Sequence, residues 1–151
     1  AITLGTYAWV KPRSDKKLRL YSDNFPKDGI RELDMTDLAY RGSDSWANYV
    51  KGVFVYLVDL GFAFPHGLDI AFYGNIPNGS GLSSSASFEL LVGVIARKVY
   101  TLDIDTLGLV KVGKRVENDF IGVNSGIMDQ FAVGMGKKDH AIFLDCATLD
   151  R

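Results

Sequence analysis

Alternating hydrophobic and polar positions are the clearest signal in the first half of the chain. Residues 17–22 place Leu18 and Leu20 on one side and charged or polar side chains on the other, a pattern typical of a half-buried strand. The same signal recurs near residue 70 and is weaker in two other β-prone segments. Strands are predicted over residues 7–11, 17–22, 30–35 and 68–75, and we expect the first three to form an antiparallel meander.

Helical spacing replaces alternation in two longer segments. Residues 46–60 carry hydrophobic side chains three and four positions apart, with Ser45 as the expected N-cap and Gly61 as the expected residue after the helix. Residues 84–100 are apolar nearly all round. Such a helix is predicted to lie inside the molecule, with other elements packed on several sides.

The order of the elements predicts the fold class. Beyond residue 100, Asp103 or Asp105 is expected to cap a helix ending near Phe120, followed by a short helix over residues 127–133 and a closing strand over residues 141–144. Strands therefore come first, then helices, then a strand, which favours an α+β fold over alternating βαβ units. No internal repeat or linker divides the chain, so one domain is expected over residues 1–151.

A glycine- and serine-rich segment joins the predicted strand to the apolar helix. Residues 77–87 read PNGSGLSSSAS. Gly79 and Gly81 allow an anion to approach the main chain, and the first turn of the following helix has N–H groups without partners. The segment therefore predicts a nucleotide-phosphate site, although a flexible turn with a helix cap has the same composition. It lacks the Gly-Lys-Ser/Thr of a Walker A loop, which disfavours a P-loop NTPase.

Composition narrows the function classes further. With 17 basic and 18 acidic residues the formal net charge is −1, and no basic block indicates a nucleic-acid partner. Cys146 is the single cysteine, which suits a reducing compartment, and we expect a cytoplasmic location. His66 and His140 lack metal-ligand spacing, and no apolar run approaches the roughly 20 residues of a membrane span. Both ends look abrupt, so we expect a piece of a longer protein.

Two acidic residues are further candidates for chemistry. Glu117 lies late in a predicted helix, where the helix dipole does not favour it, although Lys114 offers a plain salt bridge. Asp129 lies in an otherwise apolar stretch that begins at Gly126. Phosphoryl transfer needs donors on the phosphates, hard oxygen ligands for Mg²⁺ and a group that orients the attacking hydroxyl. A serine, a glutamate and an aspartate suit these tasks.

Three blocks of the sequence resemble the GHMP small-molecule kinases. Residues 77–87 are similar to the phosphate loop of that family, in the form typical of its galactokinase branch. Residues 117–131, which read ENDFIGVNSGIMDQF, resemble the next block, and residues 140–146 resemble the strand that follows it. The resemblance keeps the order and spacing of the blocks over essentially the whole chain. It implies the N-terminal domain of a GHMP kinase, with a fold like domain 2 of ribosomal protein S5, truncated at its N-terminus.

The resemblance also implies a function and a site. The parent enzyme would transfer the γ-phosphoryl group of ATP to the anomeric O1 of galactose, with Mg²⁺ as cofactor. Asp129 would accept the proton of the sugar hydroxyl, and Gly126 would contact the sugar beside it. Ser85 and Glu117 would bind Mg²⁺, and Ser22 would lie near the nucleotide. The ATP phosphates would be bound by Gly79, Ser80, Gly81, Leu82, Ser83, Ser84 and Ser85.

The resemblance is incomplete, and several alternatives stay open. The family's N-terminal signature, an Arg beside the base and a Glu-His-Thr-Asp run, does not occur in the chain, and the C-terminal GHMP domain is absent from it. The 151-residue chain alone is therefore expected to be nearly inactive and to self-associate through an unpaired strand edge. The alternatives are another GHMP sugar kinase, such as one acting on N-acetylgalactosamine, a non-catalytic galactose or ATP sensor, and a generic α+β binding module.

Overall fold

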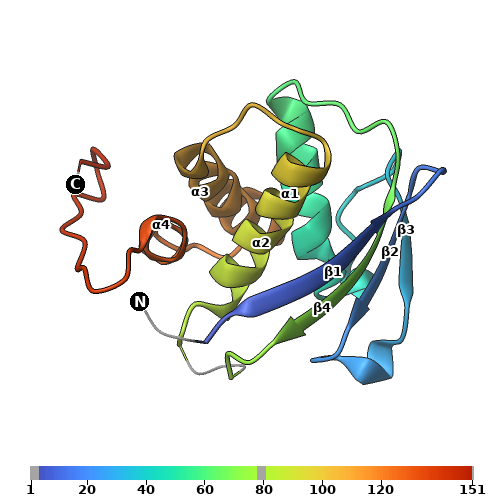
Figure 1. The fold of residues 1–151 in the computed structure, drawn as a ribbon, viewed down its shortest axis with the longest axis horizontal. Helices are drawn as coiled ribbons and strands as arrows, with labels where there is room; N and C mark the ends of the chain where they lie inside the picture. Colours follow the sequence, from blue (N-terminus) through green and yellow to red (C-terminus); the bar gives the residue numbers. More distant parts are fainter. Residues whose placement is uncertain (1–3, 78–80, 151) are drawn as a thin grey trace.

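The computed structural model describes residues 4–77 and 81–150, and it places helices against one face of a single sheet (Figure 1). The strands are β1 (Thr6–Pro12), β2 (Lys17–Ser22), β3 (Arg31–Asp34) and β4 (Leu68–Gly74). The helices are α1 (Ala47–Asp59), α2 (Ser84–Val99), α3 (Thr106–Arg115) and α4 (Met128–Met135). Two 3₁₀ turns, η1 (Pro26–Asp28) and η2 (Gly42–Asp44), and a π-helical turn, η3 (Val116–Ile121), complete the set. The predicted α+β class is confirmed.

The strand order is β1-β4-β2-β3, so the predicted antiparallel meander is wrong. β4 lies between β1 and β2, antiparallel to the first and parallel to the second (Figure 1). The turn between β1 and β2 bonds to Gly67 at the entry of β4, through Arg13 N to Gly67 O at 2.9 Å and Gly67 N to Asp15 O at 2.6 Å. A Cβ at Gly67 would lie 1.9 Å from the Lys17 carbonyl oxygen, so only glycine allows β4 to enter there.

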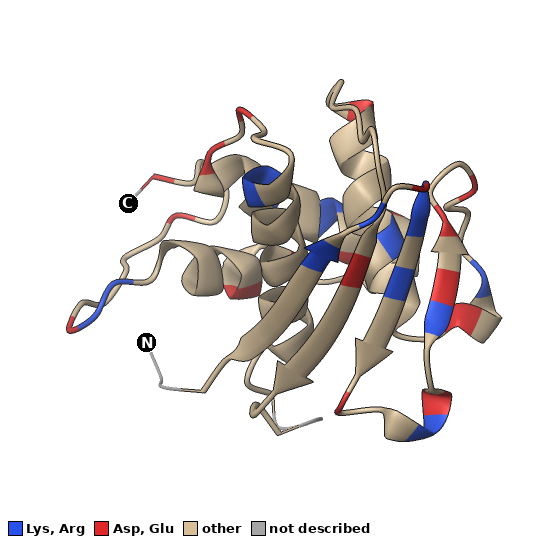
Figure 2. Ribbon diagram, turned by 45° about the vertical axis from the view of Figure 1, so that its right-hand side comes forward, with Lys and Arg blue, Asp and Glu red and all other residues tan. Residues whose placement is uncertain are grey.

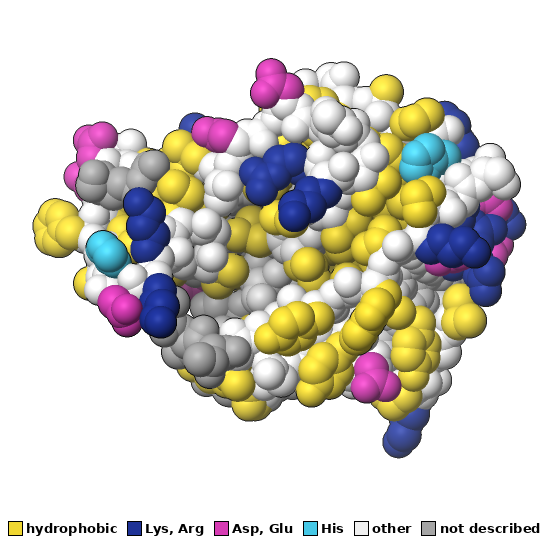
Figure 3. Space-filling view, viewed as in Figure 1, with side chains coloured by type: hydrophobic (Ala, Val, Ile, Leu, Met, Phe, Trp, Pro, Cys, Tyr) yellow, Lys and Arg dark blue, Asp and Glu magenta, His cyan; other side chains and the backbone are white. Residues whose placement is uncertain are grey.

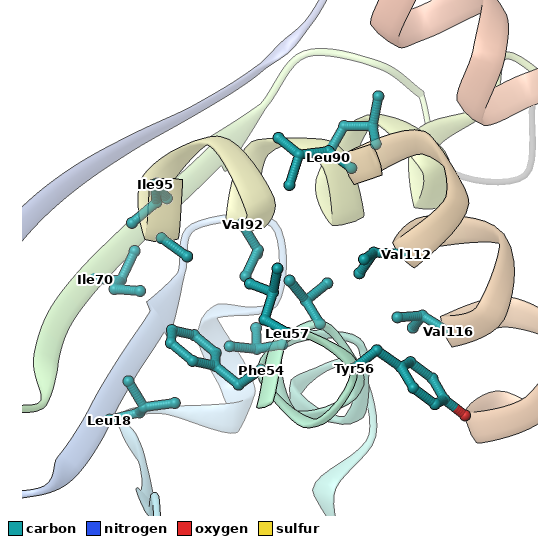
Figure 4. Packing of buried hydrophobic residues seen from close by; sticks show 14 of the residues in the cluster. Leu18, Phe54, Tyr56, Leu57, Ile70, Leu90, Val92, Ile95, Val112 and Val116 are labelled. Carbon is teal, nitrogen blue, oxygen red and sulfur yellow. The ribbon is translucent and has the colours of Figure 1, made fainter. Parts of the chain in front are cut away.

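The core fills the space between the sheet and the helices. Leu18 pairs beside Leu68 and Leu20 beside Ile70, and all four side chains are buried. Figure 4 shows side chains of the sheet, α1 and α2 meeting in one cluster, with Phe54 and Leu57 of α1 at its centre. The predicted burial of the second long helix is confirmed by Val92, Ile95 and Ala96, which all lie in this cluster. Two buried residues in this part of the molecule, Glu89 and Gln130, are polar, and both are discussed with the candidate site below.

The ends of α1 differ from each other in how well the sequence predicts them. Ser45 is not the N-cap: it ends η2 with a φ of 48°, α1 begins after Trp46, and the cap position carries no side-chain hydrogen bond. At the other end Gly61, with a φ of +94°, donates to Val58 O at 2.8 Å, and Phe62 N donates to Leu57 O at 3.1 Å. This pair of bonds is the Schellman motif, so the predicted role of Gly61 is confirmed.

The C-terminal part departs from expectation at its last element. The helix predicted to run to Phe120 divides into α3 and the π-helical turn η3, and Asp105 caps it by accepting from Gly108 N at 2.6 Å. The closing strand predicted over residues 141–144 is wrong, since these residues form no strand. They lie beyond α4, away from the sheet, where no strand of the described chain is available as a partner, and Phe143 is 92% exposed (Figure 1).

The open face of the sheet carries both charges and aromatic rings. Basic and acidic residues alternate on neighbouring strands (Figure 2), as in the ion pair between Lys17 and Glu32 at 2.5 Å. Hydrophobic side chains gather over β1 and β4 in the lower part of Figure 3. Exposed aromatic residues on these strands are Tyr7 and Trp9 of β1 and Tyr73 of β4. Within the described residues, no helix is long and apolar enough to cross a membrane.

Candidate functional site

The N-terminus of α2 follows a turn with left-handed backbone. Gly81 has a φ of +70° and Ser83 a φ of 57°, with exposed Leu82 between them. Ser83 O accepts the helical bond from Ser87 N at 3.0 Å, but among the described residues its side chain caps no N–H group. The first N–H groups of α2 have no partner within the helix, which is the arrangement that suits an anion. The other predicted phosphate-binding residues, Gly79 and Ser80, lie outside the described residues.

Two predicted metal ligands from distant parts of the sequence meet at this helix end. Ser85, in the first turn of α2, donates its Oγ hydrogen to Glu117 Oε1 at 2.5 Å. Glu117 lies at the start of η3 and is only 7% exposed. A π-helical turn inserts an extra residue per turn, and such turns occur often at functional sites. The result is a hydroxyl and a carboxylate, both hard oxygen groups, side by side at the N-terminus of α2.

The second oxygen of Glu117 is held by the loop before α4. Ser125 Oγ donates to Glu117 Oε2 at 2.6 Å. Lys114 does not pair with Glu117, as the sequence allowed; its ammonium group donates to the backbone oxygen of Ser125. Burial raises the pKa of Glu117, but hydrogen bonds from Ser125, Ser85 and Gln130 and the charge of Lys114 outweigh it, so the pKa lies below its ordinary value. Glu117 is therefore a carboxylate at neutral pH.

The predicted base and sugar contact lie at the start of α4. Asp129 is in the first turn of that helix and is exposed, and Gly126 is exposed in the loop before it. Within residues 4–77 and 81–150, no hydrogen bond or ion pair joins Asp129 to Ser85 or Glu117. The amide of the next residue, Gln130, lies close enough to Glu117 to lower the pKa of its carboxyl group. The structure thus joins Ser85 and Glu117 by a direct hydrogen bond and brings the start of α4 near them through Gln130.

A pocket of about 200 Å³ opens beside the α2 N-terminus. Ser22, at the end of β2, lines it together with Ser84 and Ser85. Most of the remaining wall is aromatic, because Trp46 meets Phe72 and Phe88 edge-on, with centroids 6.1 Å apart in each pair. Among the lining residues that the sequence did not indicate are Asn24, Trp46, Tyr49 and Phe88. Trp46 and Tyr49 belong to the hydrophobic spacing of residues 46–60, which predicts a helix but gives no indication of a pocket.

Comparison with known proteins identifies the family. The profile described as "GHMP kinases N terminal domain" matches residues 48–137, which include all of α1 except its first residue, together with α2, α3, η3 and α4. The chain belongs to this family. A solved mevalonate kinase, at 19% identity and a TM-score of 0.71 over 87% of this chain and 42% of its own, shares the fold.

Closer relatives are galactokinases. The chain is 57% identical to galactokinase of Bacillus subtilis (strain 168) over 99% of its own length and 59% identical to that of Enterococcus faecalis over 96%. It spans 38% of the length of each of these relatives. The crystal structure of Lactococcus lactis galactokinase complexed with galactose matches with a TM-score of 0.95 and 49% identity, covering 99% of this chain and 38% of that one.

Proposed function

We propose that the protein carrying this chain is a galactokinase, which transfers the γ-phosphoryl group of ATP to the anomeric O1 of galactose. The galactokinase relatives at 57% and 59% identity, and the related structure with galactose, support this reaction over the other sugar kinases and the non-catalytic sensor. The observation that carries the proposal is the 2.5 Å contact of Ser85 with Glu117 at an uncapped helix N-terminus. It joins the phosphate segment to an acid 32 positions away.

The nucleotide is proposed to lie along the start of α2. Phosphate oxygens would meet the N–H groups of the first turn and the segment from Gly79 to Ser85, where the helix dipole favours negative charge. The adjoining pocket would hold the adenine ring of ATP between aromatic side chains, and Ser22 and Asn24 would be polar groups of the pocket wall. Its volume of about 200 Å³ suits a flat heterocycle better than a triphosphate.

The donor set at Ser85 and Glu117 fits Mg²⁺. Both groups offer hard oxygen, and the low pKa of Glu117 keeps its charge available. Among the described residues no cluster of three or more His, Cys, Asp or Glu could hold a metal by itself. That agrees with Mg²⁺, which commonly takes one or two protein oxygens and completes its shell with phosphates and water. When bound, the ion would neutralise charge on the transferring phosphoryl group.

Asp129 is proposed as the base that accepts the proton of the sugar O1, with Gly126 beside the sugar. Support comes from position: Asp129 follows the loop whose Ser125 donates to Glu117, and it precedes Gln130, whose amide lowers the pKa of Glu117. Gly126 is exposed, and a Cβ built on it meets nothing within 4 Å, so this part of the loop is open to a ligand.

The test is a coupled ADP-release assay on the full-length protein with galactose and with N-acetylgalactosamine. Turnover with galactose, lost in Asp129→Asn and in Glu117→Ala, supports the proposal. Preference for N-acetylgalactosamine would favour the related kinase, and ATP binding without turnover would favour a sensor.

The 151-residue chain alone is proposed to self-associate and to have little activity. β1 is an edge strand whose outer side pairs with no described strand, and Trp9 on it is 68% exposed. Sedimentation of this chain should show association that dilution reverses; a monomer at all concentrations would contradict it. We also propose a cytoplasmic location, in keeping with ATP as substrate.

A further inference from the structure

Behind the proposed metal site lies a buried acid for which the reaction has no evident use. Glu89 is one turn after Ser85 on α2, and only 1% of it is exposed. Its Oε2 accepts from Gln130 Nε2 at 3.3 Å. Gln130 is fully buried, and its amide lies close enough to Glu117 to lower the pKa of that carboxyl group. Glu89, Gln130 and Glu117 thus form a chain of contacts from the core to the site.

Two oxygen atoms in this chain have no hydrogen-bond partner within the described part of the protein. They are Glu89 Oε1 and Gln130 Oε1, one on each of two side chains that already touch. A carboxylate oxygen and an amide oxygen can only accept, so an ionised Glu89 leaves both atoms unpaired in the core. Buried acceptors without partners are costly.

One proton removes both defects. A protonated carboxyl group and a primary amide form a ring of two hydrogen bonds: the amide N–H donates to one acid oxygen, and the acid O–H donates to the amide oxygen. The first of these bonds is the 3.3 Å contact to Glu89 Oε2. The second would run from Glu89 Oε1 to Gln130 Oε1. The second N–H group of the Gln130 amide is then available to donate toward the Glu117 carboxylate.

The surroundings agree with a neutral Glu89. Burial raises the pKa of Glu89 to about 9, and the negative charge of Glu117 adds to the rise. No described ion pair involves Glu89, so no cation compensates a negative charge there. α3 packs closely against the Glu89 and Gln130 side chains, because a Cβ at Gly113 would lie 3.1 Å from Gln130 Cγ and 3.2 Å from Glu89 Oε2.

We propose that Glu89 is a positioning residue that acts as a neutral acid: it fixes the amide of Gln130, which in turn orients the Glu117 carboxylate toward the metal. This inference rests on the proposed role of Glu117. It gives Gln130 a second effect, since the same amide anchors the first turn of α4, where Asp129 lies. Groups behind a metal ligand commonly change metal affinity or activity by 10–100-fold when removed.

The test compares two variants of Glu89 in the full-length protein. Glu89→Gln keeps the shape and supplies an N–H where the acid has an O–H, so it should preserve the ring and keep Mn²⁺ affinity within about twofold of wild type. Glu89→Leu removes both bonds and should weaken Mn²⁺ binding by about tenfold or more. Mn²⁺ binding is measured by electron paramagnetic resonance with a non-hydrolysable ATP analogue, and the Mg²⁺ dependence of kcat gives a second readout.

Two controls separate the possible failures. Ile95→Ala, in the core at the other end of α2, should lower the melting temperature without changing Mn²⁺ affinity. Glu117→Ala should weaken Mn²⁺ binding at least as much as Glu89→Leu does; if it binds Mn²⁺ like wild type, the proposed metal site is wrong. If Glu117→Ala acts as expected but Glu89→Leu binds Mn²⁺ like wild type, the positioning role is wrong. If Glu89→Gln is as damaged as Glu89→Leu, Glu89 acts as an anion and the neutral acid is disproved.

Discussion

Two helices of this domain begin in opposite ways. α3 carries its own anion: Asp105 occupies the N-cap and accepts from Gly108 N at 2.6 Å. At α2 the N-cap position is Ser83, which has left-handed backbone, and among the described residues its side chain caps no N–H group. Both helix ends have the same unpaired N–H groups and the same favourable potential for negative charge. The N-terminus of α3 is capped from within the chain, whereas that of α2 has no side-chain cap from Ser83 and is the proposed phosphate site.

The surroundings of the two helix ends explain the difference. Around α2 lie Ser85 with Glu117 and the aromatic pocket. Asp105, by contrast, is exposed, and its carboxylate already closes the first turn of α3. A cap formed by the chain stabilises the fold, whereas an open end beside a carboxylate and a hydroxyl is suited to MgATP. Perturbing each end should therefore change different measured quantities.

The largest effect is expected when the proposed metal ligands at the N-terminus of α2 are removed. Glu117→Ala or Ser85→Ala should lower kcat/KM for ATP at least about 100-fold, since even groups behind a metal ligand contribute 10–100-fold. Steady-state kinetics at saturating and limiting Mg²⁺ measure it. Ser84→Ala, on the neighbouring position of the same turn, is the matched control and should lose less. Equal losses of kcat/KM in Ser85→Ala and Ser84→Ala would contradict the proposed role of Ser85 as a metal ligand.

A smaller effect follows from giving α2 the cap that α3 has. Ser83→Asp places a carboxylate at the helix end, and aspartate tolerates the left-handed backbone there. Because this charge repels phosphate, the KM for ATP should rise about tenfold, or about 1.4 kcal/mol, while stability is kept. Ser83→Asn, of the same shape without the charge, should leave KM near wild type. If both variants behave alike, charge at the helix end does not matter.

The converse change removes the cap of α3. Asp105→Ala should cost about 1 kcal/mol of stability, because the hydrogen bond to Gly108 N is lost. Chemical denaturation measures it, and the KM for ATP should not change. Asp103→Ala, two residues earlier and outside the cap, should have almost no effect on stability. A rise in KM for ATP in Asp105→Ala would show that the two helix ends are not separate in function.

The smallest effect expected is on acid stability. The pKa of Glu117 is lower in the folded protein than its ordinary value of about 4.3, so the folded state binds the proton less tightly. The stability this supplies is fully present above the unfolded-state pKa and is lost as pH falls through the folded-state pKa. Glu117→Gln should therefore lose less unfolding free energy than wild type between pH 5 and pH 3. Parallel pH curves for the two proteins would contradict it.

Most features set by a few neighbouring residues could be predicted from the sequence, the N-cap of α1 being an exception. The strands and helices follow hydrophobic periodicity, and the roles of Gly61 and Asp105 depend on hydrogen bonds within one turn. Features set by distant contacts could not. The insertion of β4 beside β2 depends on the close approach of Gly67 to Lys17, which no local pattern reveals. The prediction of a strand over residues 141–144 is wrong for the same reason, because a strand forms only where a second strand is available to pair with it.

The candidate site divides in the same way. The segment before α2 could be selected as a candidate phosphate site from local sequence, because glycine and serine before an apolar helix are typical of anion-binding turns. Ser85 and Glu117 could be paired only through the family resemblance, since they are 32 positions apart. The Glu89 and Gln130 pair was missed altogether, because a glutamate on an apolar helix looks like one of its few polar positions. Its burial and its unpaired oxygen atoms exist only in three dimensions.

The most direct measurement is a crystal structure of the full-length protein with Mn²⁺ and a non-hydrolysable ATP analogue. An anomalous peak should lie within about 2.2 Å of Ser85 Oγ and of one Glu117 oxygen, the distance expected for a small divalent cation. The phosphates should contact the first turn of α2. A peak elsewhere, with the hydrogen bond between Ser85 and Glu117 intact, would contradict the account.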